Sequence, residues 1–206
     1  MINIDKVEVV GWEHAIRGMR NPLNSWKVSD SHYEWGGKDF CVGEKDLNLM
    51  KRLASAGTDH AKYRRMITVY ADLVAPLYWW KEYDTYKVGT VANSCSTMHK
   101  IQAKEFVLDD FSHGQLDYPS KCMLKDIISV LNKNRELFIN SKDKQYWWNM
   151  IQLLPSSYNQ KRTLMLNYEV LRNMYHSRRS HKLDEWREFC KWIESLPYSE
   201  LITGGC

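Results

Sequence analysis

The sequence of 206 residues lacks the long apolar runs of membrane proteins and the basic runs of nucleic-acid-binding proteins. No stretch approaches the roughly 20 apolar residues that are needed to span a bilayer. The N-terminus, MINIDKVEVV, lacks the basic segment followed by an apolar one that marks a signal peptide. No basic run is longer than two residues, which argues against binding to a nucleic-acid duplex. These absences predict a cytoplasmic protein that binds neither membranes nor nucleic acid.

Motifs that hold a metal or a phosphate are also missing. The five cysteines are scattered without a C-x-x-C pair, as expected for reduced thiols in a cytoplasm. The seven histidines show neither H-x-x-x-H nor H-E-x-x-H spacing, so we expect no metal site. Neither G-x-x-x-x-G-K-[ST] nor G-x-G-x-x-G is present. Cys95 has no base near it in the sequence, so an inert thiol is favoured over a nucleophile.

The composition that is present describes one globular domain with a mild positive charge. The hydrophobic content of 44% is enough for one sizeable core. The 29 basic and 25 acidic residues are spread along the chain and leave a net charge of +4, which favours a small anionic ligand such as a nucleotide phosphate. Nine tryptophans and twelve tyrosines are unusual, and core packing accounts for most rings of this kind, although some can stack on flat ligands.

Hydrophobic periodicity predicts an α+β chain, organised as one domain over residues 1–206. We expect two strands of one sheet, at residues 65–74 and 161–166, with helices packed against them. Most of residues 1–43 fit no single pattern, apart from an opening strand and a helical turn near residues 14–19. The remaining helices are predicted at residues 44–56, 121–140, 142–154, 168–177 and 181–194.

The segment APLYWWKEYDTYKVGTVANSCSTMHK, which begins at Ala75, resembles the central stretch of flavin-dependent thymidylate synthases. In that family an Ala-Pro precedes an aromatic helix that leads into the signature R-H-R-x-x-S-x-N-E-x-S-x-R. In this alignment Glu82 falls on a family Gln, and Thr85, Tyr86 and Lys87 fall on the Arg-His-Arg of the signature. After one inserted residue, Asn93 and Ser96 fall on its Asn and Ser.

A second stretch carries the resemblance independently. The family has a Leu-Pro, a strand that ends in N-A-R, and then a helix that ends in Leu-Arg. Leu154-Pro155 leads without a gap to Asn167, at the start of the N-A-R position. Asn173 then falls on an Asn that contacts flavin, and Arg178 on the Arg that activates dUMP. Upstream, His60 falls on a flavin-site histidine.

The resemblance covers roughly residues 45–195 and implies a fold, an assembly and a ligand site. It implies an α+β fold with a sheet packed by helices, a homotetramer whose sites lie between subunits, and FAD as a candidate cofactor. The residues that it implies for nucleotide or cofactor binding are Arg178, Asn167, Asn173, Ser96, Asn93, Lys87, Tyr86, Glu82 and His60.

The signature departs from the family at its charged positions. Thr85 and Met98 replace arginines, Ser94 replaces the glutamate, and Ile151 stands where a further family arginine lies. Arginine suits phosphate because its planar fork donates two parallel hydrogen bonds. Each lost charge-assisted contact weakens binding by about 1.5–3 kcal/mol. We therefore expect no conversion of dUMP to dTMP.

Three hypotheses about function follow from the mixture of kept and lost residues. The first is a nucleotide-binding protein without dTMP synthesis that captures or senses a nucleotide, for example a viral protein that sequesters a host nucleotide signal. The second is an active FAD-dependent enzyme that methylates or otherwise modifies a pyrimidine nucleotide, with Tyr86, Lys87 and Arg178 as surviving groups. The third is a relative that only mediates assembly. The lost arginines argue against the second, and the retained Asn167 and Arg178 against the third.

The first hypothesis places a phosphate-bearing nucleotide in a cleft bordered by Arg178, Asn167 and residues 87–96. Plainer roles compete at each position: Asn167 and Asn173 as helix caps, Arg178 as an ion pair favoured by a helix C-terminus, and His60 as an ordinary satisfied histidine. Asn173 and Arg178 are separated by about 140° around a helix. They can flank one ligand only if the helix unwinds near Ser177 or if they serve clefts shared with different subunits.

Overall fold

The computed structural model of the chain describes residues 2–37 and 40–204, so Gly205 and Cys206 lie outside it. The chain divides into two compact units. Of the described residues, unit 1 contains 2–5, 72–85 and 92–163, and unit 2 contains 6–37, 40–71, 86–91 and 164–204. In the described ranges, no helix is long and apolar enough to cross a membrane.

A four-stranded sheet contains both strands predicted from periodicity. Its order is β1 (Asn3–Val10), β4 (Thr68–Pro76), β6 (Asn159–Asn167) and β5 (Val91–Ser94). The predictions that residues 65–74 and 161–166 supply strands of one sheet are confirmed, since β4 and β6 are neighbours. A second sheet pairs β2 (His32–Tyr33) with β3 (Phe40–Cys41) in antiparallel register, with Tyr33 opposite Phe40.

The predicted start of β4 at residue 65 is wrong by three residues. Residues 62–66 form the 3-10 helix η3 (Lys62–Met66), which buries Arg64 at 3% exposure. The guanidinium of Arg64 lies 3.7 Å from the carboxylate of Glu169, so this turn is held by an ion pair that a local pattern cannot reveal. Strand β5 was not predicted, because all four of its residues are exposed and show no apolar alternation.

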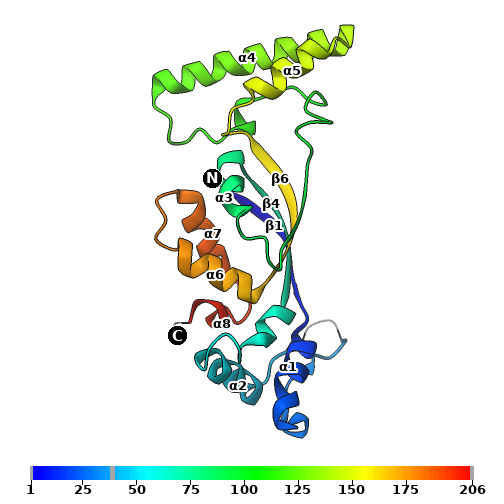
Figure 1. The fold of residues 1–206 in the computed structure, drawn as a ribbon, viewed down its shortest axis with the longest axis vertical. Coiled ribbons are helices and arrows are strands. Elements are labelled where there is room, and N and C mark those ends of the chain that lie inside the picture. The colour runs from blue at the N-terminus through cyan, green and yellow to red at the C-terminus, as the bar shows by residue number, and fades with distance from the viewer. Residues whose placement is uncertain (1, 38–39, 205–206) are drawn as a thin grey trace. The chain divides into compact units, whose positions relative to one another are not determined.

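Unit 1 contains two consecutive helices, α4 (Tyr118–Ser141) and α5 (Lys144–Leu153), which pack side by side (Figure 1). The carboxylate of Asp117 accepts the backbone N–H of Ser120 and caps α4, while Asp143 accepts that of Gln145 and caps α5. Pro155 follows α5, as predicted. The core beneath them consists of Ile101, Phe106, Phe111, Leu124, Ile128, Leu131 and Met150.

Helix α3 (Leu77–Tyr83) supplies a second, aromatic cluster in unit 1. Trp79, Trp80 and Tyr83 are almost fully buried and contact one another, with ring centroids 4.9–5.3 Å apart. The indole N–H of Trp80 donates to the carbonyl of Gln160, and the guanidinium of Arg162 lies 4.2 Å above the Trp80 ring. The aromatic run after Pro76 is therefore core, as the plainer interpretation of such rings expects.

Unit 2 contains the helices α1 (Trp12–Arg20), α2 (Glu44–Ser55), α6 (Tyr168–Arg178), α7 (Asp184–Glu194) and α8 (Glu200–Thr203), with 3-10 turns η1 (Asn21–Leu23), η2 (Trp26–Val28) and η3. Tyr168 contacts Trp12 edge to face at 5.3 Å, which packs the start of α6 against α1. The apolar faces of α6, α7 and α8 meet in a core that includes Leu171, Met174 and Phe189.

A buried carboxylate ties the N-terminal part of unit 2 together. Asp46, in the first turn of α2, is fully buried and accepts five hydrogen bonds. The donors are the Nε of Arg20, the hydroxyls of Ser29 and Ser31, and the backbone N–H groups of Asp30 and Ser31. Asp30 in turn accepts the backbone N–H groups of Lys45 and Asp46. The loop that follows η2 is thereby fixed to the start of α2.

Candidate functional site

Arg178, the last residue of α6, is held against two aromatic rings of unit 2. Its Nε donates to the hydroxyl of Tyr86 at 2.9 Å. Its guanidinium carbon lies 4.9 Å from the centroid of Trp186 and 5.6 Å from that of Tyr86. The two rings are themselves in edge contact at 6.0 Å. A half-buried guanidinium is therefore oriented by one hydrogen bond and two ring faces.

The loop that carries Tyr86 is a tight turn. The hydroxyl of Thr90 donates to the carbonyl of Tyr86 at 2.6 Å. Gly89 has a φ of +76°, and a Cβ atom there would lie 2.7 Å from the side-chain amide of Asn167. Both the backbone conformation and the close approach require glycine at this position. The turn places Lys87 on an exposed stretch one residue from Tyr86.

Asn167 acts as the N-cap of α6. Its side-chain oxygen accepts the backbone N–H of Val170 at 2.9 Å, and its side-chain amide donates to the carbonyl of Gly89 at 3.4 Å. Of the two roles that the sequence leaves open, the cap is the one its contacts bear out. The same side chain also joins α6 to the Tyr86 turn, so it positions Arg178 and Tyr86 from the other end of the helix.

Asn173 and His60 do not join this arrangement through any contact among the described residues. Both side chains are exposed. Helix α6 continues without a break to Arg178, so the unwinding near Ser177 that would bring Asn173 toward the same ligand does not occur. At five residues along a regular helix, Asn173 points about 140° away from Arg178.

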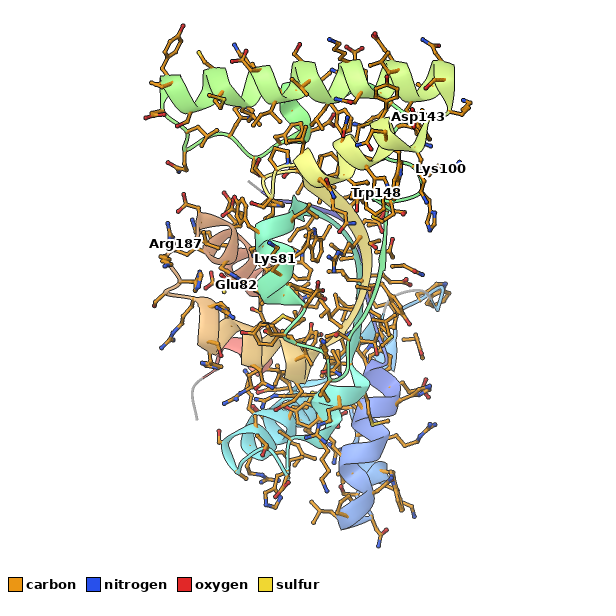
Figure 2. All side chains as sticks on the ribbon, turned by 45° about the horizontal axis from the view of Figure 1, so that its top comes forward. Lys81, Glu82, Lys100, Asp143, Trp148 and Arg187 are labelled. Carbon is orange, nitrogen blue, oxygen red and sulfur yellow. The ribbon has the colours of Figure 1, made fainter. Side chains whose placement is uncertain are left out.

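The remaining predicted site residues, Glu82, Asn93 and Ser96, belong to unit 1. Figure 2 shows Glu82 beside Lys81 on α3. Asn93 is exposed on β5, and the hydroxyl of Ser96 accepts the backbone N–H groups of Met98 and His99. Ser96 is therefore engaged in closing its own turn.

The donor set that a flavin dinucleotide would need is poorly represented at the signature positions. The hydroxyl of Thr85 donates to the carbonyl of Glu82 at 2.7 Å. Met98 has no polar donor in its side chain, and the hydroxyl of Ser96 is used locally. The residues at these positions thus do not fit the phosphates of FAD in the way that arginines would.

One member of the arrangement, Trp186, was not predicted. It is fully buried on α7 and contacts Arg178, Tyr86 and His181. The sequence offers only a weak signal for it, an aromatic residue on the apolar face of an amphipathic helix, which is typical of core. Across residues 2–37 and 40–204, no group of three or more His, Cys, Asp or Glu side chains is arranged to hold a metal ion.

Comparison with solved structures identifies relatives of the fold. The chain is similar to thymidylate synthase X (ThyX) from Helicobacter pylori, solved with FAD and dUMP, with a TM-score of 0.73, 17% identity and coverage of 98% of each chain. A second structure of the flavin-dependent enzyme from that organism, complexed with FAD and dUMP, gives 0.70 and 18%, covering 97% of this chain and 98% of that one.

A third similar structure is the UMP/dUMP methylase PolB from Streptomyces cacaoi, bound with 5-Br dUMP. Its TM-score is 0.60 at 14% identity, and the match covers 95% of this chain and 89% of that one. No protein-family model matches the chain, and no curated protein matches its sequence. The predicted α+β fold of the flavin-dependent thymidylate synthase type is therefore confirmed, at the level of fold.

Proposed function

We propose that this protein binds a phosphate-bearing nucleotide at Arg178 and the Tyr86 turn, and that it does not synthesise dTMP. The observation that carries the proposal is the Arg178 guanidinium, fixed by the Tyr86 hydroxyl and the Trp186 ring. A guanidinium that is already oriented loses little conformational entropy when it meets a phosphate. The likeness of the fold to structures solved with dUMP and with 5-Br dUMP adds support.

Some residues of unit 2 supply positive charge for the nucleotide, and others position the charged residues. Arg178 supplies planar N–H donors for phosphate oxygens. Lys87, exposed on the same turn as Tyr86, adds a mobile positive charge. Asn167 and Gly89 set the turn against α6 and so keep Tyr86 within reach of Arg178. Capture or sensing of a nucleotide requires nothing more than this binding.

The absence of dTMP synthesis follows from the residues at the charged signature positions. Thr85, Ser94 and Met98 carry no charge, and the hydroxyl of Thr85 is committed to a backbone carbonyl. We expect that a thymidine-requiring strain carrying this gene does not grow in medium without thymidine. Growth without thymidine would overturn this part of the proposal.

Calorimetric titration of the purified protein tests the binding. The ligand panel consists of dUMP, UMP and cyclic nucleotides. The test variant is Arg178→Ala, and the matched control is Arg179→Ala, which removes the exposed arginine next to it in the sequence. Arg178→Ala should weaken binding by about 1.5–3 kcal/mol, the scale of a charge-assisted hydrogen bond, while Arg179→Ala changes it little. Equal affinities in wild type and Arg178→Ala would refute the site.

The alternative, a FAD-dependent enzyme acting on a pyrimidine nucleotide, has one observation in its favour: two of the similar structures were solved with FAD. Its test is the absorbance spectrum of the purified protein. An oxidised-flavin band that survives dialysis would favour the enzyme, and a colourless preparation that still binds nucleotide favours capture or sensing.

We also propose that the chain assembles as a homotetramer. In unit 1, α4 and α5 expose Met123, Val130, Trp148 and Leu153 at 41–60%. Apolar side chains exposed together on one element are typical of interfaces. Light scattering at micromolar concentration should give about four times the chain mass of 24.4 kDa. A mass of one chain would contradict the proposal.

A further inference from the structure

Unit 2 holds a cavity of about 570 Å³ that involves none of the residues of the Arg178 site. It is open to solvent and is bordered by one face of α1, the turns η1 and η2, and the β2–β3 ribbon. Its lining includes Ile16, Arg17, Arg20, Trp26, His32 and Tyr33. The volume is within the range typical of small-molecule sites.

Arg20, a largely buried residue, contributes a donor that the described protein atoms leave unused. The residue is 4% exposed and lines the cavity. Its Nε donates to Asp46, and its Nη1 donates to the backbone carbonyl and the hydroxyl of Ser25. Within residues 2–37 and 40–204, Nη2 has no hydrogen-bond acceptor. Nη2 is not one of the fully buried atoms that lack a partner, so solvent reaches it, and an acceptor atom in the cavity could form a charge-assisted hydrogen bond with it.

Arg17 adds a second positive charge on the same face of α1. It precedes Arg20 by three residues, so the two side chains are neighbours on the helix surface. Arg17 is exposed and lines the cavity. In the described part of the chain it has no ion-pair or hydrogen-bond partner. Two guanidinium groups, one buried and one at the surface, thus face a single space.

Aromatic side chains form the apolar part of the lining, in contrast to the two arginines. The indole N–H of Trp26 donates to the side-chain oxygen of Asn21 at 2.9 Å, and the hydroxyl of Tyr33 donates to Glu13 at 3.1 Å. Phe40 contacts the Tyr33 ring edge to face at 4.9 Å. With their polar atoms bonded to neighbours, the residues Trp26 and Tyr33 remain 48% and 51% exposed, and both line the cavity. Aromatic side chains of this kind can stack on a flat ring.

The walls are held in place before any ligand arrives. Ser29 and Ser31, which line the cavity, both donate to the buried carboxylate of Asp46, as does Arg20. The backbone N–H of Gly43 donates to the hydroxyl of Ser31, which fixes the same loop a second time. A site that is built in advance binds with a smaller entropic cost than one that must be ordered.

We propose that this cavity binds a flat aromatic compound with a single negative charge. The ring packs on Trp26 and Tyr33, and the acidic group accepts hydrogen bonds from Nη2 of Arg20 and from Arg17. The carboxylate of Glu13, which accepts from Tyr33 in the same lining, repels a second negative charge. The site therefore favours an aromatic carboxylate or sulfonate over a phosphate dianion.

Two fluorescent probes that differ in charge test this directly. 8-Anilinonaphthalene-1-sulfonate carries one negative charge, and N-phenyl-1-naphthylamine is the same ring system without the sulfonate. Arg17→Gln should weaken binding of the sulfonate about fivefold, as expected for a partly exposed charge pair, and should leave the neutral probe unchanged. Trp26→Ala should weaken binding of both probes.

Matched variants away from the cavity provide the controls. Arg52→Gln removes an exposed arginine from α2, and Trp35→Ala removes a fully exposed tryptophan; neither residue lines the cavity. Both controls should bind the two probes like wild type. Equal affinity for the sulfonate in Arg17→Gln and Arg52→Gln, or unchanged binding of both probes in Trp26→Ala, would overturn the proposal. Thermal unfolding of each variant confirms that it is folded.

Discussion

Two arginines of unit 2, Arg20 and Arg178, are held in opposite ways. Arg20 is 4% exposed, and its Nε faces a carboxylate, Asp46, that is itself fully buried and accepts five hydrogen bonds. Arg178 is half-buried, and its Nε meets a neutral hydroxyl and two aromatic rings. The first arrangement pairs a buried cation with a buried carboxylate, whereas the second orients a cation through a hydroxyl and two aromatic rings.

The difference separates an arginine that holds the fold from one that we propose as a ligand contact. A buried ion pair is lost at high cost, because removal of one partner leaves the other charged and desolvated. A cation over aromatic rings contributes about 0.5–1 kcal/mol at an exposed site, so the fold depends on it less. Substitutions at the two arginine networks should therefore separate stability from binding.

The largest effect is expected for Asp46→Asn. The amide leaves the buried Arg20 without its anionic partner and replaces one acceptor oxygen by a donor. We expect the free energy of unfolding to fall by about 3–5 kcal/mol, a large part of the usual 5–15 kcal/mol. Urea unfolding at neutral pH measures it, with the exposed Asp59→Asn as control. A loss below about 1 kcal/mol would show that Asp46 is not the anchor that its contacts indicate.

Acid should remove the same contribution from the wild-type protein. Burial opposes ionisation of Asp46, but hydrogen bonds from Ser29, Ser31 and Arg20 outweigh it and hold the pKa of its carboxyl below the ordinary value. The folded pKa is thus lower than the unfolded one, near 3.9. The stability is present above about pH 3.9 and is lost as the pH falls through the folded pKa.

The comparison with Asp46→Asn isolates this titration, because the variant lacks the group. The difference in unfolding free energy between wild type and variant should stay constant from about pH 7 to about pH 5 and shrink below about pH 4. Urea unfolding at several pH values measures the difference. A gap that widens in acid would contradict the lowered pKa.

The sequence predicts these regions unequally, for physical reasons. The helical pattern of residues 44–56 and the apolar strand before Pro76 are local, and periodicity alone finds them. The Arg20–Asp46 pair joins two helices across 26 residues of sequence, so no local pattern predicts it. Tyr86 and Arg178 were predicted because they align with positions of the resembled family. Trp186 does not align with such a position, and its sequence pattern indicates only a core residue.

Residues with two local uses were the hardest to predict. In sequence, Asn167 fits a ligand-binding role and a cap role about equally well, whereas Ser96 is predicted as a site residue through the resemblance alone. In the structure the side chain of Asn167 accepts the N–H of Val170, and that of Ser96 accepts the N–H of His99. Short polar side chains often bond to neighbouring backbone groups, and this local use leaves their assignment to a ligand site a prediction.

A smaller effect on stability is expected for Asn167→Ala. The substitution removes the N-cap of α6 and the donor to Gly89, so the free energy of unfolding should fall by about 1 kcal/mol. Asn167→Asp is the matched variant, since it keeps the capping oxygen and lacks the amide donor. Urea unfolding should rank wild type above Asp and Asp above Ala. An alanine variant as stable as wild type would show that the cap contributes nothing.

The smallest effect on stability is expected for Tyr86→Phe, which removes one hydroxyl and keeps the ring that faces Arg178. The lost hydrogen bond is partly exposed, so we expect a loss of about 0.5 kcal/mol, the low end of the usual range. Its effect on ligand binding should be distinct, because the Nε of Arg178 then has no hydroxyl to fix the plane of the guanidinium.

Nucleotide affinity in Tyr86→Phe should therefore lie between those of wild type and Arg178→Ala, and the double variant should bind no more weakly than Arg178→Ala alone. That non-additivity is the signature of a residue that acts through its neighbour. Calorimetric titration of the four proteins decides the matter. If Tyr86→Phe and Arg178→Ala weaken binding additively, the hydroxyl contacts the nucleotide itself and does not position Arg178.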